Sequence, residues 1–137
     1  MKNRRIVKIV LLVLLITIIP LWSGCTQDED CGDCTTELIT HDITIDGAIL
    51  RMYKGKPVIY GAFYSGYLVQ KVYCYICNEN VAKDLIAKVK KGEMITVNVR
   101  GKLRELRAGE EQINPSTWGS DETAFTSDIQ ILKIKKV

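Results

Sequence analysis

Histidine is scarce in this chain, which contains His41 and no other among its 137 residues. A metal site built from several histidines is therefore excluded, and no motif places a serine, a cysteine or a second acid near His41 to make it a catalytic base. The chain also lacks a phosphate-binding glycine loop, a nucleophile elbow, a zinc-protease motif and a calcium loop. We therefore expect a protein that is not an enzyme.

Acidic residues are missing from the first 24 positions, which hold four of the 19 basic residues and none of the 16 acidic ones. The remainder of the chain therefore carries 15 basic against 16 acidic residues, a formal charge of −1. The formal charge of +3 of the whole chain does not describe a basic surface on a folded domain. Nucleic acid is accordingly not an expected partner, because its binding depends on contacts from basic residues to phosphates.

Long hydrophobic runs are also absent. The apolar stretch at residues 9–22, interrupted by Thr17 and Pro20, has 14 residues, whereas a helix needs about 20 to cross the hydrocarbon core. A positive segment precedes it and small residues follow, which is the layout of a secretory signal. A single-pass N-terminal membrane anchor remains the alternative.

The residues that follow this run, Leu21-Trp22-Ser23-Gly24-Cys25, resemble the lipobox of bacterial and archaeal lipoproteins. Trp22 departs from the family, which usually has an aliphatic residue there. The resemblance implies cleavage before Cys25, attachment of lipid such as palmitate to that cysteine, and a protein held on the exported face of the cell membrane. A plain cleaved signal, with Cys25 an ordinary thiol, stays open.

The chain length allows one domain after the signal. We expect a signal at residues 1–24, an acidic tether at 25–36 and a globular domain at 37–137. In that domain, apolar residues alternating with a period of two predict strands. The predicted strands are residues 39–50, 58–63, 68–76, 94–106 and 125–134, with a helix at 81–89 and a long polar loop at 107–123. Gly47 predicts a bulge that bends the first strand, and Asn80 is expected to cap the helix.

Three strands, one helix and two strands form the order of a five-stranded Greek-key barrel. The glycine-bent segment 45–48, the helix before Gly92, residues 97–102 and the ending 128–134 resemble an OB fold of the nucleic-acid-binding type that recurs in exported proteins. The fold class expected is thus mainly β, an OB-type barrel with one helix between its third and fourth strands, preceded by a hydrophobic signal or anchor helix. A small sandwich or another barrel is the alternative.

Four cysteines besides Cys25 form two C-x₂-C pairs, Cys31 with Cys34 and Cys74 with Cys77. Two such pairs have the spacing of a tetrahedral thiolate site for zinc or iron. Outside the cytosol the same thiols more often form disulfides, and bonds between the two pairs would close loops of about 40 residues. Disulfides, a metal site and thiol exchange all remain open.

Tyrosines are concentrated on the first three predicted strands. The OB resemblance implies a ligand face on strands two and three, where aromatic rings stack on bases or sugars. The candidate ligand-binding residues are Tyr60, Tyr64, Tyr73, Tyr75, Arg51 and Lys71. A plain alternative is that tyrosines suit a half-buried sheet. The expected function is an exported, membrane-anchored module that binds a small molecule, a glycan, a peptide or a protein through this face and the loop 107–123. The rival is a metal-binding or thiol-redox protein.

Overall fold

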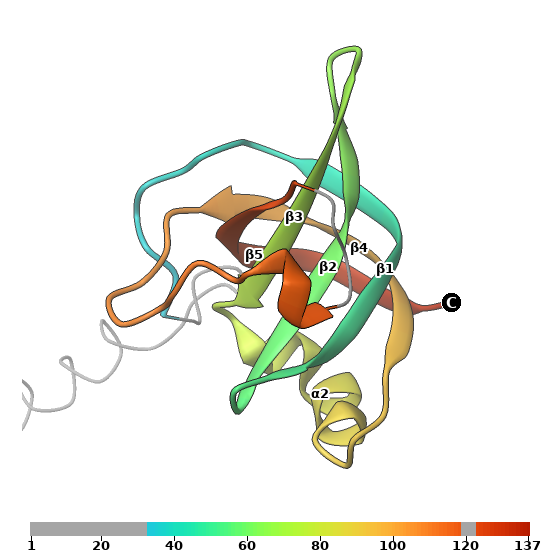
Figure 1. Cartoon of the computed structure of the whole chain (residues 1–137). Helices are drawn as coiled ribbons and strands as arrows, with labels where there is room; N and C mark the ends of the chain where they lie inside the picture. Colours follow the sequence, from blue (N-terminus) through green and yellow to red (C-terminus); the bar gives the residue numbers. More distant parts are fainter. Residues whose placement is uncertain (1–32, 119–122) are drawn as a thin grey trace, which may run out of the picture.

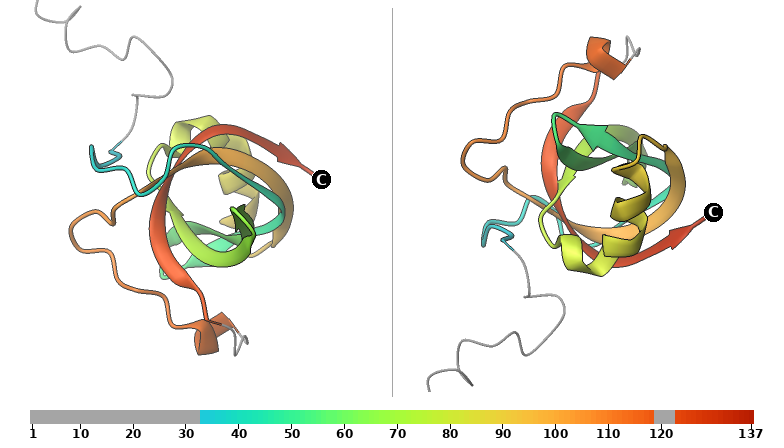
Figure 2. Two further views of the ribbon diagram at one scale, coloured as in Figure 1. Left: turned by 90° about the horizontal axis from the view of Figure 1, so that it is seen from above. Right: turned by 90° about the horizontal axis from the view of Figure 1, so that it is seen from below.

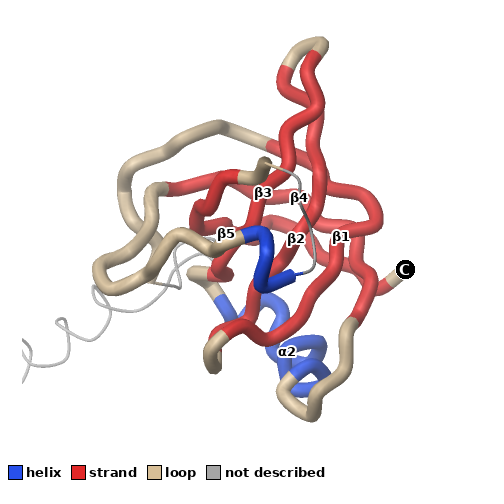
Figure 3. The backbone as a smooth tube through the Cα atoms, viewed as in Figure 1, coloured by secondary structure: helices blue, strands red, loops and turns tan. Residues whose placement is uncertain are grey.

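The computed structural model describes residues 33–118 and 123–137 (Figure 1). The strands are β1 (Ile43–Tyr53), β2 (Lys56–Ser65), β3 (Leu68–Ile76), β4 (Ile95–Arg104) and β5 (Phe125–Lys136). Helix α2 (Lys83–Val89) follows a 3-10 turn, η2 (Glu79–Ala82), and a second 3-10 turn, η3 (Pro115–Trp118), lies in the connection from β4 to β5. Figure 3 shows the predominance of strand in this part of the chain.

The five strands close into a barrel in the order β1-β2-β3-β5-β4. β3 and β5 are parallel, and the other neighbouring pairs are antiparallel. The prediction of a mainly β domain with a five-stranded barrel and one short helix between the third and fourth strands is therefore confirmed. Views along the barrel show α2 lying across one end (Figure 2), where Ala82, Ile86 and Val89 join the core.

The bend of β1 occurs where the sequence predicts it. The pairing of β1 with β4 shifts register between Ile45 and Ala48, and Gly47 between them has a φ of +68°. A side chain is strained in that conformation, whereas glycine is not. The side-chain oxygen of Asn98 accepts a hydrogen bond from the Gly47 N–H at 2.8 Å, which satisfies the amide that the bulge frees.

The alternation of side chains along β3 places two different clusters on its two faces. Val72, Cys74 and Ile76 lie in the main core inside the barrel. Tyr73 and Tyr75 lie in a second buried cluster, on the outside of the barrel. The period-two alternation that predicts a strand at residues 68–76 is therefore confirmed.

The helix begins differently from the prediction. No side chain caps α2 or the preceding turn η2, so the expected cap by Asn80 is wrong. Asn78, fully buried, instead bonds to the backbone of β5: its side-chain oxygen accepts from the Ile131 N–H at 2.7 Å, and its nitrogen donates to the Ile131 carbonyl at 2.8 Å. The Asn78 side chain thus links the segment after β3 to β5. It makes the two hydrogen bonds that the backbone of a paired strand residue would otherwise make.

No helix within residues 33–118 and 123–137 is long and apolar enough to cross a bilayer. The predicted signal at residues 1–24, with Cys25, and the tether as far as residue 32 lie outside the described residues.

Candidate functional site

The outer face of β2 and β3 carries a cluster of stacked aromatic rings. The rings of Tyr60 and Tyr73 stack with their centroids 4.6 Å apart, and the Trp118 ring lies 5.2 Å from Tyr73 and 6.1 Å from Tyr60. The Arg51 guanidinium lies 4.4 Å from the centroid of the Trp118 ring, within cation–π distance. Tyr73 is fully buried beneath this arrangement. The chain's own tryptophan therefore occupies the surface that the sequence assigns to a ligand.

Strand β5 holds the covering segment, residues 105–118, in place. Outward positions recur at every second residue of a strand, and the three outward residues Thr126, Asp128 and Gln130 bind the covering segment or the last residue of β4 just before it. Thr126 Oγ1 accepts a hydrogen bond from the Ile113 N–H at 2.8 Å. Gln130 Oε1 accepts one from Arg104 Nε. Asp128 Oδ2 lies 2.9 Å from Arg107 Nε. Side chains of β5 therefore hold the covering segment over the tyrosine face.

Arg107 lies between two buried carboxyl groups, those of Asp128 and Glu110, and is itself partly exposed. Arg107 Nη2 lies 2.9 Å from Glu110 Oε2, and the Arg107 N–H donates to Glu110 Oε1 at 2.8 Å. Burial, together with the adjacent Glu110 carboxylate, raises the pKa of Asp128 to about 8. Burial opposes ionisation of Glu110 as well, but Asp128 and Arg107 hold the pKa of Glu110 below its usual range. Near neutral pH, Asp128 therefore keeps its proton while Glu110 is the ionised partner of Arg107.

A cleft of about 190 Å³ remains open between the β1–β2 turn and the covering segment. Its lining residues are Tyr53, Lys54, Lys56, Tyr75, Gly109 and Glu111. Lys54 Nζ lies 3.4 Å from Glu111 Oε2, and the Tyr75 hydroxyl donates to the Glu111 carbonyl at 2.9 Å. Burial raises the pKa of Tyr75 to about 12, so this phenol remains a donor at neutral pH.

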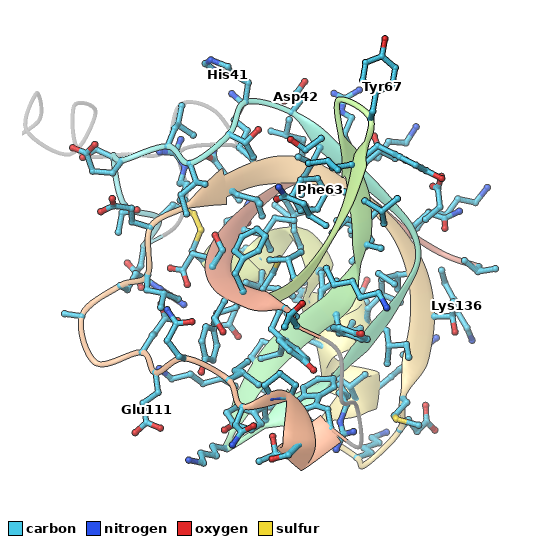
Figure 4. All side chains as sticks on the ribbon, turned by 45° about the horizontal axis from the view of Figure 1, so that its top comes forward. His41, Asp42, Phe63, Tyr67, Glu111 and Lys136 are labelled. Atoms are coloured by element: carbon cyan, nitrogen blue, oxygen red, sulfur yellow. A yellow bond between two sulfur atoms is a disulfide. The ribbon has the colours of Figure 1, made fainter. Side chains whose placement is uncertain are left out.

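A second cleft, of about 250 Å³, adjoins the first and shares Lys56 and Tyr75 with it. Its lining adds four charged residues: Asp33 from the start of the described chain, Glu79 from η2, and Arg107 and Glu110 from the covering segment. Each lysine of the first cleft lies over a tyrosine: Lys54 Nζ is 5.5 Å from the Tyr53 ring centroid, and Lys56 Nζ is 5.5 Å from that of Tyr75. The joined clefts therefore combine aromatic surface with charged groups of both signs. Figure 4 shows the Glu111 side chain extending from the loop into solvent.

The structure divides the predicted ligand-binding residues among three places. Arg51, Tyr60 and Tyr73 surround Trp118, and Tyr75 reaches the cleft. Tyr64 is exposed on the β2–β3 hairpin, and Lys71 lies half-buried at the base of that hairpin. The predictions therefore did not identify one contiguous surface.

Trp118 and Asp128 were missed by sequence reasoning. The sequence does offer an indication that Trp118 has a structural or binding role. It is the one tryptophan after the predicted signal segment, and it lies in a loop that is otherwise polar.

The cysteines do not behave as two equivalent pairs. Cys34 and Cys77 form a disulfide across 43 residues, which is one of the bonds between the two pairs that the sequence left as an alternative. Cys74 is a free thiol inside the barrel, and Cys31 lies outside the described residues. Two of the four candidate metal ligands are thus joined to each other and a third faces the core, an arrangement unsuited to a tetrahedral zinc or iron site. In the described part of the chain, no three His, Cys, Asp or Glu residues gather at metal-binding distance.

Comparison with protein-family models, with curated proteins and with solved structures finds no match to this chain. A barrel of this size can serve many functions, because function depends on the site and not on the fold. The clefts and the aromatic cluster are therefore the basis on which a function can be argued.

Proposed function

We propose that this protein is an exported, lipid-anchored binding module with an OB-type barrel, and that it recognises a short oligosaccharide. Support for the OB assignment comes from the strand order β1-β2-β3-β5-β4 with parallel β3 and β5. OB barrels bind oligonucleotides and oligosaccharides on strands 2 and 3, between the loops that join strands 1–2 and 4–5. The observation that carries the proposal is the pair of adjoining clefts at that position.

The lining of the clefts favours a sugar over a polyanion. The half-buried Tyr53 ring offers a flat apolar surface for the carbon face of a sugar, and Lys54 and Glu111 offer a donor and an acceptor for its hydroxyl groups. Acidic groups also line the second cleft, and the chain after residue 24 has a formal charge of −1. A nucleic acid or another polyanion would meet no uniformly positive surface there.

The size of the clefts indicates how large the ligand is. Sites for drug-sized molecules occupy about 300–1,000 Å³, whereas the two clefts here measure about 190 and 250 Å³. Each cleft therefore suits one small unit, such as a monosaccharide. Because the clefts adjoin at Lys56 and Tyr75, a chain of two or three units fits them better than a single larger molecule.

A binding titration tests this function. Soluble oligosaccharides from prokaryotic cell envelopes would be titrated against the mature chain, with isothermal calorimetry as the readout. Removal of the sugar-facing ring by Tyr53→Ala is expected to weaken binding at least about tenfold, which corresponds to about 1.4 kcal/mol. Tyr67→Ala on the distant β2–β3 hairpin is the matched control and should bind as the parent does. Equal affinity of the Tyr53→Ala variant and the parent would exclude these clefts as the site.

The anchoring part of the proposal concerns Cys25. The Cys34–Cys77 disulfide supports export, because such bonds persist in oxidising compartments. Acyl chains on Cys25 would hold the domain at the membrane with about 0.8 kcal/mol for each buried CH₂ group. Cys25→Ala is expected to abolish the lipid mass at the mature N-terminus and to release the chain from the membrane fraction. An unchanged membrane-bound fraction would contradict lipid anchoring.

A further inference from the structure

The β2–β3 hairpin extends beyond the barrel as a two-stranded ribbon. β1 pairs with β2 only as far as Tyr60, and β5 pairs with β3 only from Val72 onward. Between these points β2 and β3 pair with each other alone, through to Ser65 opposite Leu68. Figures 1 and 3 show the hairpin projecting from the end of the barrel opposite α2. An isolated two-stranded ribbon gains little stability from its own pairing in water. We therefore expect the side chains of its tip to make a contact that stabilises it.

The tip of this ribbon exposes large apolar side chains. Tyr67 is fully exposed, and Tyr64, Leu68 and Val69 have 80%, 68% and 56% of their surface accessible. Figure 4 shows Tyr67 pointing away from the body of the protein. Residues 57–70 contain no charged residue, and the first charge on either side is a lysine, Lys56 or Lys71. An exposed apolar group of this kind, free of acidic residues, marks a contact surface.

The apolar side chains occur on both faces of the ribbon. Tyr64 and Val69 are directly paired, so they share one face. Leu68 is the next residue along β3 and therefore lies on the opposite face. A protein surface covers one face of a ribbon and leaves the other in water, whereas a lipid layer surrounds an inserted tip on both faces. The two-sided pattern therefore fits a lipid surface better than contact of one ribbon face with a protein surface.

We propose that the tip formed by residues 64–69 inserts shallowly into the surface of a lipid bilayer. The two strand pairs of this tip, Tyr64 with Val69 and Ser65 with Leu68, and the turn beyond them span about 7 Å, which lies within the about 5–10 Å depth of interfacial insertion. Tyrosine is enriched at that level because its ring is apolar and its hydroxyl binds water and headgroups. Insertion stays shallow because the turn at Gly66 and Tyr67 has backbone groups that no strand satisfies.

The proposed lipid anchor and the tip can reach the same membrane. The Cys34–Cys77 disulfide fixes the tether beside the end of β3, and the tip lies at the other end of that strand. Nine residues of β3 extend about 30 Å, and the nine residues from Thr26 to Cys34 have about the same maximum reach. With the tip inserted and β3 standing upright on the membrane, Cys77 lies about 30 Å above the surface, a distance that the extended tether just spans, so both contacts form together. This orientation rests on the proposed anchoring at Cys25 but does not depend on saccharide binding.

Site-specific fluorescence on vesicles tests the insertion. The chain carrying Ser65→Cys would be labelled with an environment-sensitive fluorophore and reconstituted into phosphatidylcholine vesicles, with Lys88→Cys on α2 as the matched control. The buried Cys74 will not react, and the parent chain labelled in the same way gives the background from Cys31. We expect fluorescence at position 65 to rise severalfold on vesicles and to be quenched by bromine-labelled lipids, while position 88 stays unchanged. Because the hairpin carries no acidic residue and little charge, adding phosphatidylglycerol or salt should change the signal little.

The outcomes separate the tip from the anchor. Co-sedimentation with vesicles reports anchoring, whereas the fluorophore reports insertion. A chain that sediments with vesicles while position 65 remains as exposed to water as position 88 would overturn the proposal. Shielding of position 65 without vesicles, rising with protein concentration, would also overturn it, because the tip would then bind a second copy of the chain. Loss of the vesicle signal in a Tyr67→Ser, Leu68→Ser chain that still sediments would support insertion.

Discussion

At the scale of single residues, Asp128 determines how stability depends on pH. Its pKa is raised from 3.8 to about 8, so the folded protein binds a proton that the unfolded chain releases between these values. The free energy of unfolding should therefore fall as pH rises from about 4 to about 8, and the contribution is lost above the folded-state pKa. The pKa of Glu110 is lowered from 4.5, so this residue gives the opposite slope, but only below about pH 4.5. The two carboxyls interact and titrate as a pair.

The matched test is Asp128→Asn, which keeps the shape of the side chain and removes its titration. Urea unfolding of the parent between pH 5 and 9 should show the falling free energy, and the variant should show a flatter dependence. Equal slopes for the two chains would mean that Asp128 is ionised in the folded protein.

Asn78 is the second residue whose role can be tested alone. Its amide satisfies both backbone groups of Ile131 in the buried space between β3 and β5. Asn78→Ala leaves those groups without partners, and we expect the free energy of unfolding to fall by about 2–4 kcal/mol. Asn80→Ala, two positions away and exposed, is the control and should change it by less than about 0.5 kcal/mol. Similar losses in both variants would show that Asn78 has no special role.

At the scale of elements, the covering segment decides which part of the sheet a ligand can reach. Trp118→Ala uncovers Tyr60 and Tyr73 and should lower the free energy of unfolding by about 2 kcal/mol. This is less than the about 3–5 kcal/mol of a fully buried tryptophan, because Trp118 is half-exposed. Hydrogen exchange should quicken at Ile113, whose amide is bound to Thr126. Unchanged exchange there would show that the segment is held without the tryptophan.

The strands were predictable from sequence because local alternation determines them. The faces of β3 and the glycine bulge of β1 both followed from residues within one strand. The covering segment was not predictable, because Ile113 and Arg107 meet Thr126 and Asp128 only after the barrel closes. For the same reason the sequence does not distinguish an asparagine that bonds to a distant strand from one that caps a helix. The sequence predicts a cap at Asn80, whereas Asn78 has the structural role.

At the scale of the whole molecule, the disulfide ties the start of the described chain to the barrel. Cys34 and Cys77 are 43 residues apart, and the chain-entropy model gives about 4 kcal/mol of stabilisation for a loop of that length. Cys34→Ala removes the crosslink and leaves Cys77 as a thiol. In non-reducing buffer this variant should have a free energy of unfolding lower than that of the parent by about this amount. The same variant should match the parent once a reductant is present. A difference that persists under reducing conditions would assign the loss to packing and not to the crosslink.

The molecule has a covered aromatic face and open clefts beside it, and tyrosines of β2 and β3 contribute to both. Under the proposed saccharide binding, the ligand lies at the edge of the sheet near Lys54, Gly109 and Glu111 and not at its centre. Backbone amide shifts of the isotopically labelled mature chain, followed during titration with an envelope oligosaccharide, test it most directly. We expect shifts at Gly55 and Gly109, with the Tyr73 amide and the Trp118 indole unchanged. Shifts centred on Tyr60, Tyr73 and Trp118 would contradict it, because the ligand would then have displaced the covering segment.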